Sequence, residues 1–296
     1  MTPPPTRTWR LRLAASLLAA LTALSITPSF AADYVLPERT LVNGLVFKKG
    51  STLTVNNAGF PVRGTLEAVT LNNGLSWAAD AELTLSDNAI PSLVVSGKLA
   101  PADQKISALG KTLTLKGGTT VVMQQPLLST LGVFTVASDL PLDAGSVSAN
   151  TAMAGTEVTL NDDQSVRAAT LSAGFDAQGL RFAPGLSSFY PGGKPLNLGP
   201  LRMGTLDVDG LLGGVLLAKG TKVTFNETGT IAELQLARST KFGEVLIPEK
   251  SVLIYAGRRI SQVFLGADLA HKGKTYLASQ YVPFNFVGEP YVPQIK

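Results

Sequence analysis

The sequence predicts an all-β protein in which about eight units of ~30 residues, each made of β-hairpins, stack into an extended or rolled sheet. Three observations support this prediction. Short stretches alternate apolar and polar residues, similar stretches recur 30 positions apart, and turn-forming residues separate them. Because a unit of this size cannot bury its apolar face alone, neighbouring units have to pack against one another.

The alternating stretches share the pattern apolar-Thr-apolar, which places the two apolar residues on one face of a strand. They are Leu53-Thr54-Val55, Leu83-Thr84-Leu85, Leu113-Thr114-Leu115, Val158-Thr159-Leu160 and Val223-Thr224-Phe225. Glycines repeat the period, since Gly213, Gly243 and Gly273 are also 30 apart. The combination of period and alternation predicts one strand pattern copied along the chain.

Two departures from the period predict insertions near residues 121–150 and 191–210. The step from Leu113 to Val158 is 45 residues, and the step from Gly185 to Gly220 is 35. A loop that interrupts a regular scaffold has no packing reason to exist, so these insertions are places to look for function. Neither contains a recognisable chemical motif.

The turns favour hairpins over the alternative architecture, a parallel β-helix with about one turn per unit. Asn226-Glu227-Thr228-Gly229 joins two strand patterns, and its Gly can adopt positive φ. The chain ends with atypical units, as a stack requires, because Pro283 and Pro293 remove backbone donors at the expected edge.

The N-terminus has the layout of a signal peptide. Arg7, Arg10 and Arg12 precede the apolar stretch Leu13 to Ile26, which is shorter than the ~20 residues of a spanning helix. Small residues predict cleavage between Ala31 and Ala32. The expected organisation is a signal peptide at 1–31 and a single β-repeat domain at 32–296, with a periplasmic, cell-envelope or extracellular destination.

Charge and composition exclude several partners. Removing the three signal-peptide arginines from the 25 Lys and Arg leaves 22, against 21 Asp and Glu. Without a basic cluster we expect no nucleic-acid binding. After the signal no apolar stretch reaches 18 residues, so we expect no transmembrane helix. The chain has no cysteine, and its fold therefore has to rely on burial and backbone pairing.

Catalysis is not expected, and no catalytic residue, metal ligand or cofactor is assigned. His271 is the only histidine and lies at a unit junction, where a loop position explains it better than a role as a base. Asp207-Val208-Asp209-Gly210 resembles the start of a calcium loop, but Ala218 stands where an EF-hand needs a carboxylate. The acids of Asn161-Asp162-Asp163 are assigned to a turn, and Asp80, Glu82, Asp87 and Asp103 to the surface or connectors.

The aromatic residues are expected mainly in the core. The candidates for a binding platform are Trp77, Phe189, Tyr190, Tyr255, Tyr276, Tyr281 and Phe284. Phe225, Tyr255 and Tyr190 are predicted to share one position of the unit with Leu85 and Leu115, which would make them part of one continuous apolar layer.

The expected function is therefore that of an exported, non-catalytic β-repeat protein of the cell envelope or exterior. It would act as a structural scaffold or as a binding or adhesion module, with an envelope protein, a lipid or a polysaccharide as partner. Two alternatives stay open. One is an outer-membrane β-barrel, which needs longer strands of about 9 to 11 residues. The other is a lipid- or polysaccharide-handling envelope protein, because a rolled sheet can leave an apolar trough.

Overall fold

The computed structural model describes residues 32–42, 45–57, 61–67, 70–72, 74–85, 94–124, 130–212 and 214–291. The predicted signal peptide at 1–31 lies outside these residues. The regular structure of the described residues consists of 32 strands. They contain no helix that is long and apolar enough to cross a membrane.

Most strands belong to one sheet of 18 strands. Its members are β1 (Ala32–Val35), β4 (Thr52–Val55), β5 (Pro61–Thr65), β8 (Glu82–Leu85), β9 (Val94–Lys98), β12 (Thr120–Met123), β13 (Leu131–Thr135), β14 (Leu140–Leu142), β15 (Asn150–Ala152), β16 (Glu157–Leu160), β17 (Val166–Leu171), β20 (Gly185–Phe189), β21 (Leu201–Thr205), β24 (Lys222–Phe225), β25 (Ile231–Gln235), β28 (Val252–Ala256), β29 (Arg259–Phe264) and β32 (Tyr281–Pro283).

The other strands form two-stranded hairpins. They are β2 (Thr40–Val42) with β3 (Leu45–Phe47), β6 (Thr70–Asn72) with β7 (Leu75–Trp77), β10 (Gln104–Ala108) with β11 (Lys111–Leu115), β18 (Phe175–Ala177) with β19 (Leu180–Phe182), β22 (Gly210–Leu212) with β23 (Val215–Leu217), β26 (Thr240–Phe242) with β27 (Val245–Ile247), and β30 (Leu269–His271) with β31 (Lys274–Tyr276). The pair β14–β15 takes the corresponding place in the fourth unit.

The order of the elements confirms a stack of hairpin units. Each of the first seven units gives one hairpin to the outer row and then two strands to the large sheet, and the eighth gives one hairpin and β32. The sheet strands follow one another in chain order, as in β4–β5–β8–β9. Every pairing between named strands is antiparallel, so the alternative of a parallel β-helix is wrong. Eight such units build the described chain.

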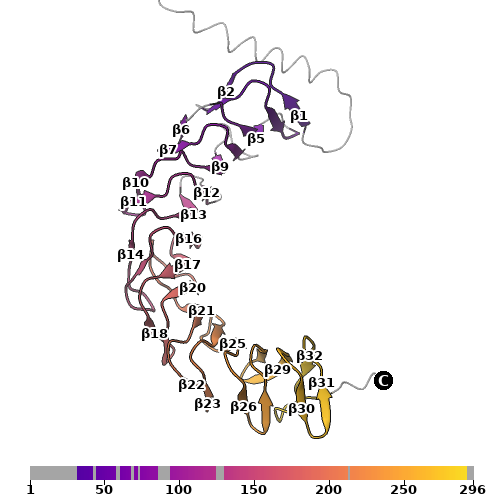
Figure 1. Cartoon of the computed structure of the whole chain (residues 1–296). Coiled ribbons are helices and arrows are strands. Elements are labelled where there is room, and N and C mark those ends of the chain that lie inside the picture. Colours follow the sequence, from indigo (N-terminus) through magenta and orange to yellow (C-terminus); the bar gives the residue numbers. More distant parts are fainter. Residues whose placement is uncertain are drawn as a thin grey trace, which may run out of the picture.

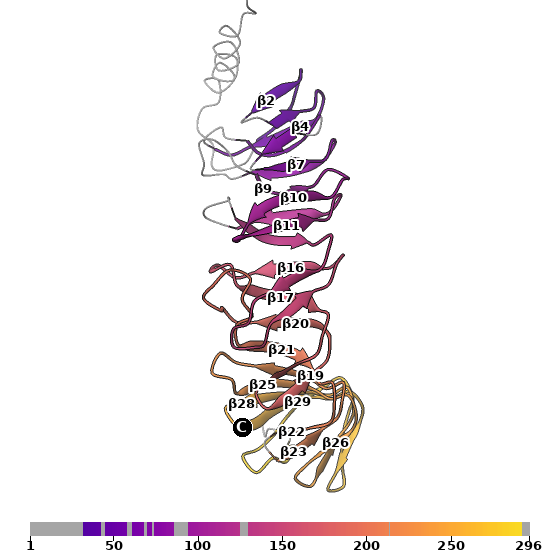
Figure 2. The ribbon, with the colours of Figure 1, turned by 90° about the vertical axis from the view of Figure 1, so that its left-hand side faces the viewer.

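The units form an arc of two layers (Figure 1). The large sheet lines the concave side, and the hairpins lie along the convex side, where Figure 2 shows them side by side. Sheet strands are hydrogen-bonded throughout and lie about 4.8 Å apart. Neighbouring outer hairpins contact each other through side chains without forming a shared ladder, and therefore need more length per unit. This difference bends the stack toward the sheet.

One continuous apolar core fills the space between the layers. Phe47 and Phe182 end outer hairpins and are fully buried, and each packs over a glycine of the sheet. A Cβ atom added to Gly64 would lie 2.9 Å from the Phe47 ring, and one added to Gly204 would lie 2.7 Å from the Phe182 ring. A large aromatic ring of one layer thus faces a glycine of the other, which allows the dense packing of a protein core.

The two long rims of the arc differ. At one rim the chain passes from the outer hairpins to the sheet. Most of these connections are four-residue corners whose third residue has positive φ, for example Gly50, Gly118 and Gly220. At the opposite rim the strands of each layer are joined to one another in hairpins, and no described segment of the chain passes from one layer to the other there. The seven sheet hairpins each carry a register shift beside this open rim, as between Thr224 and Phe225. Such bulges redirect the side chain that follows.

One assumption behind the predicted period is wrong. Leu113 lies on β11 in the outer layer, and Val121 on β12 is the counterpart of Leu53 and Leu83. Both layers bury alternate residues toward the same core, so the apolar-Thr-apolar pattern occurs in either.

Two long loops fall within the ranges where insertions are predicted. Residues 143–149 join β14 to β15, where hairpins such as β18–β19 need only two residues. Residues 190–200 join β20 to β21. Residues 125–129, which lie outside the described residues, also fall within the first range.

Candidate functional site

The concave face of the sheet carries one continuous cross-strand row of side chains. Core-facing residues alternate with this row, so it lies on the outer face of the sheet. The row runs through Asp33, Thr54, Arg63, Thr84, Ser96, Val122, Val133, Thr159, Ala168, Ser188, Met203, Thr224, Glu233, Ile254, Gln262 and Pro283.

Nine consecutive members of this row, from Thr84 to Thr224, carry no charge. We call them the concave stripe. At ~4.8 Å per strand the stripe is about 38 Å long. Threonines occupy its two ends, Val122 and Val133 lie next to each other nearer its middle, and Met203 lies beside Thr224. The stripe is an extended uncharged surface of mixed polarity along the inside of the arc.

Charged side chains border the stripe on the same face. Glu82, Lys98, Glu157 and Lys222 are exposed and lie two residues along their strands from members of the stripe. Both signs are represented, and Glu82 pairs with Arg63 at 2.5 Å on the neighbouring strand. An elongated partner in the stripe would therefore meet an uncharged strip with charges of both signs beside it.

Aspartates at the corner rim have a repeated structural role. In five of the units, the side chain of the residue just before the outer hairpin accepts a hydrogen bond from the backbone N–H two residues after that hairpin. The pairs are Asp103 with Gly117 (2.9 Å), Asp139 with Ala154 (2.8 Å), Asp209 with Lys219 (2.8 Å) and Asp268 with Ala278 (2.7 Å), and the Ser239 hydroxyl does the same for Glu249 (3.1 Å). In the sequence, this contact corresponds to an Asp or Ser directly before a strand.

The acids that were candidates for a calcium site form hydrogen bonds or ion pairs with nearby residues. The amide of Lys219 and then the guanidinium of Arg238 lower the pKa of Asp209 below its usual value. Burial acts to raise the pKa of Asp163, but hydrogen bonds from Ser165 and from the Gly193 amide outweigh it and lower that pKa. Asp207 pairs with Lys219 at 3.4 Å.

The described part of the chain contains no group of three or more His, Asp or Glu side chains placed to hold a metal ion. Asp80 pairs with Lys48 at 2.5 Å on the surface. Asp87 lies outside the described residues.

His271 lies at the end of β30, beside the two-residue turn that leads to β31. Its Nε2 atom is buried and has no hydrogen-bond partner. The Glu289 carboxylate accepts a hydrogen bond from Lys272, which lowers the pKa of Glu289, and the nearby His271 contributes to the same shift. Among the described residues, no nucleophilic side chain forms a hydrogen bond with the imidazole.

The aromatic candidates divide between core and rim. Trp77 and Phe189 are buried, and Tyr276 and Phe284 nearly so. The prediction that several of these residues share one position of the unit is correct for Leu85, Phe225 and Tyr255. Each directly follows the bulge of its strand, β8, β24 or β28. It is wrong for Tyr190 and Leu115. The counterpart in β20 is Phe189, and Leu115 belongs to the outer layer.

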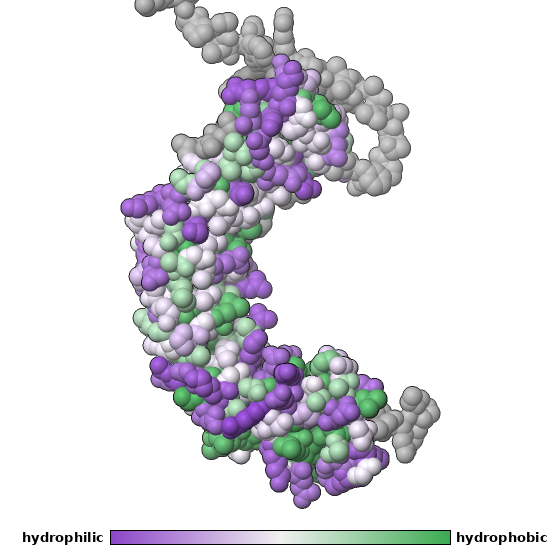
Figure 3. Space-filling model, viewed as in Figure 1, coloured by the Kyte–Doolittle hydropathy of each residue, from purple (hydrophilic) through white to green (hydrophobic). Residues whose placement is uncertain are grey.

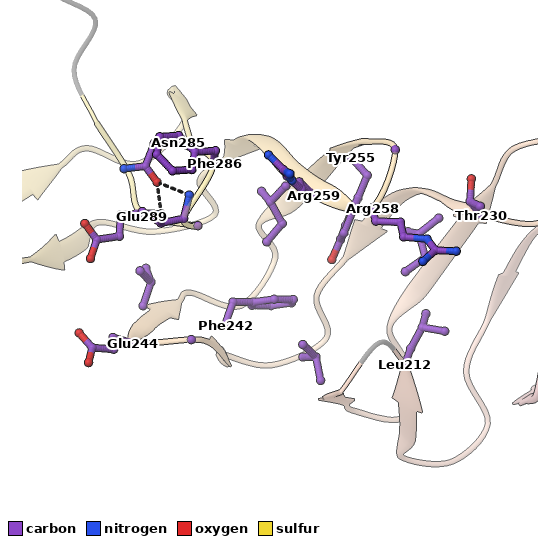
Figure 4. A pocket seen from close by; sticks show the side chains of 18 of the residues that line it. Leu212, Thr230, Phe242, Glu244, Tyr255, Arg258, Arg259, Asn285, Phe286 and Glu289 are labelled. Carbon is purple, nitrogen blue, oxygen red and sulfur yellow. Dashed lines mark hydrogen bonds between the residues drawn. The ribbon is translucent and has the colours of Figure 1, made fainter.

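A groove opens between the layers along the open rim of units six to eight, and Figure 4 shows it from close by. We call it the rim groove. Its cavity volume is about 900 Å³, within the range of small-molecule sites. The outer hairpins contribute Leu212, Val215 and Phe242, and the sheet contributes Tyr255 and Ile260. A smaller cavity of about 260 Å³ opens at the same rim in units two and three.

The same opening is filled by the protein itself in units four and five. Leu196 and Leu198, from the loop 190–200, are fully buried there. The loop pairs with the other long loop, since Asp143 N–H donates to Leu196 O at 3.0 Å and Leu198 N–H donates to Asp143 O at 3.1 Å. We call this pair of loops the plug. It shows that the space between the layers accepts apolar chain.

The rim groove was not predicted from the sequence. Its lining residues come from units five to eight, so no single unit of the sequence marks it. One feature of the sequence could have indicated it. The connection between the two sheet strands of a unit has eleven residues at 190–200 but only two at 257–258.

No protein-family model matches the sequence, and no curated protein is significantly similar to it.

Proposed function

We propose that this protein is exported and acts, without catalysis, as a binding and scaffold module of the cell envelope or exterior. The concave stripe carries this proposal. It is long, uncharged and built on a continuous hydrogen-bonded sheet, and so offers a rigid, pre-formed surface to an elongated partner such as a polysaccharide or an envelope protein.

The arrangement of the acids supports a non-catalytic role. Several carboxylates weighed as candidate sites are engaged in corner hydrogen bonds or surface ion pairs, as with Asp103, Asp209 and Asp80. The corner hydrogen bonds recur in several units. Residues that stabilise a repeated fold recur in this way, whereas an active site occurs once.

Export is tested in the native host by fractionation and by the mass of the mature N-terminus. We expect a chain that begins at Ala32 and occurs in the periplasmic, extracellular or envelope fraction. An uncleaved chain in the cytoplasm would refute the proposal.

The role of the concave stripe is tested by binding of purified residues 32–296 to isolated envelopes. Val133→Glu places a charge in the middle of the stripe, and Leu246→Glu places one at an exposed position of the outer hairpin β27. We expect the first variant to lose binding and the second to keep it, with unchanged circular dichroism for both. The reverse result would move the binding surface to the convex side.

A further inference from the structure

The rim groove has the character of an apolar binding site. Phe225 and Val245 are buried at 1% exposure, and Phe242 at 8%, so its floor is shielded from water. Leu212, Val215 and Ile260 are half-buried along its walls. In the space-filling view, hydrophobic patches on this limb of the arc lie beside hydrophilic ones (Figure 3). Burial of further apolar surface in this groove is therefore favourable.

The polar groups of the groove are separated along its length. Figure 4 shows Glu244 and Glu289 toward one end, and Arg258 and Arg259 nearer Tyr255. Glu289 accepts a hydrogen bond from Lys272, whose pKa is raised by this bond and further by the charge of Glu244. The two arginines are exposed and have no ion-pair partner among the described residues. The arginine end of the groove is thus free to receive an anion.

Tyr255 adds a polar group at the arginine end. Its hydroxyl points into the groove and makes no hydrogen bond to any described residue. A half-buried hydroxyl without a protein partner is available to a ligand headgroup.

The plug indicates why an acyl chain fits this groove better than a peptide. Every residue of an extended peptide brings an N–H and a C=O that need partners when buried. In the plug, Leu196 N–H donates to Gln164 O and Val166 N–H donates to Asn197 O, in addition to the bonds with Asp143. The seven-residue loop that supplies Asp143 is replaced in unit seven by the two-residue turn Gly243-Glu244. An acyl chain needs no such partners.

We propose that the rim groove binds a single-chain amphiphile with an anionic headgroup, of the fatty acid class. The acyl chain lies between the layers on Phe225, Phe242 and Val215, and the carboxylate lies at Arg258 and Arg259. This site is separate from the concave stripe.

Calorimetric titration of purified residues 32–296 with laurate, below its micelle concentration, tests the proposal. Dodecanol and dodecyltrimethylammonium serve as probes with the same chain and a different headgroup. We expect one laurate per chain, weaker binding of dodecanol, and the weakest binding of the cation. Equal binding of all three probes would overturn the assignment of the headgroup.

Two variants separate the headgroup from the chain. Replacing both Arg258→Gln and Arg259→Gln should weaken laurate binding at least tenfold, the effect of losing a charge-assisted hydrogen bond, and change dodecanol binding less than twofold. Val215→Trp fills the groove and should abolish binding of both. The matched controls are Arg167→Gln on the concave face and Leu246→Trp on the convex side, and both should bind as the wild type does.

The melting temperature of each variant shows whether it is folded. If Val215→Trp does not fold, Ile260→Trp fills the opposite wall and carries the same expectation. Laurate binding that survives both the arginine and the tryptophan variants would refute the site. Tighter binding of the plug peptide, residues 194–199, than of laurate would replace the amphiphile by a peptide. Either failure leaves the concave stripe, tested through Val133→Glu, unaffected.

Discussion

Replacing Gly204 by alanine tests whether the two layers are held at contact distance by the packing of Phe182 on glycine. The added Cβ would lie 2.7 Å from Cδ1, 3.2 Å from Cε1 and 3.3 Å from Cγ of the Phe182 ring. The ring cannot easily turn away, because it is fully buried, stacks on Phe175 at 5.5 Å and meets Phe225 edge-on at 6.3 Å. Either the ring or the sheet has to move.

Overpacking of this kind costs about 1 to 3 kcal/mol in free energy of unfolding. For a chain of this size about 1 kcal/mol lowers the melting temperature by roughly 2 to 4 °C, so Gly204→Ala should melt about 2 to 12 °C below the wild type. Thermal unfolding followed by circular dichroism measures the shift.

The double variant Gly204→Ala with Phe182→Leu provides the control. The smaller side chain gives the new methyl group room, so we expect the double variant to be more stable than the sum of the two single effects predicts, by about 0.5 to 3 kcal/mol. A Gly204→Ala variant that melts with the wild type, or strictly additive effects, would refute the packing argument.

Three further predictions concern the plug, a corner and the groove. Leu198→Ala should cost about 2 to 5 kcal/mol and open the rim of units four and five, detected by denaturant unfolding and by new binding of the dye anilinonaphthalene sulfonate; unchanged stability would mean that the plug is not packed. Because the pKa of Asp209 is lowered in the folded protein, its contribution to stability is present above its unfolded value of 3.8 and is lost as the pH falls through the lower folded value. The stability difference between wild type and Asp209→Ala should therefore shrink below about pH 4, and a difference that persists at lower pH would contradict this assignment. Burial raises the pKa of Tyr255 to about 12, so the neutral phenol stabilises the fold fully below pH 10 and its contribution falls as the pH rises from 10 toward 12. Ultraviolet titration of Tyr255→Phe should lack one tyrosine that ionises near pH 12, and loss of a component near pH 10 would contradict the burial.

The sequence by itself determined the all-β class, the hairpin unit and the number of units, because these depend on local properties. The alternation in Leu53-Thr54-Val55 reflects the two-residue period of a strand, and the turn residues Asn226 to Gly229 reflect backbone conformation. Gly229 has a φ of 77°, as a turn glycine should.

Only the tertiary structure decided which layer each strand joins. Leu113 and Leu53 have the same neighbours in sequence, but one faces the core from the outer row and the other from the sheet. Both layers bury the same kind of side chain, so the pattern cannot separate them. The tertiary structure also brings together two loops that are far apart in sequence, through Asp143 and Leu198, and leaves the rim groove open where the turns are short. Both outcomes depend on the stacking of units, and stacking is not encoded in any single repeat.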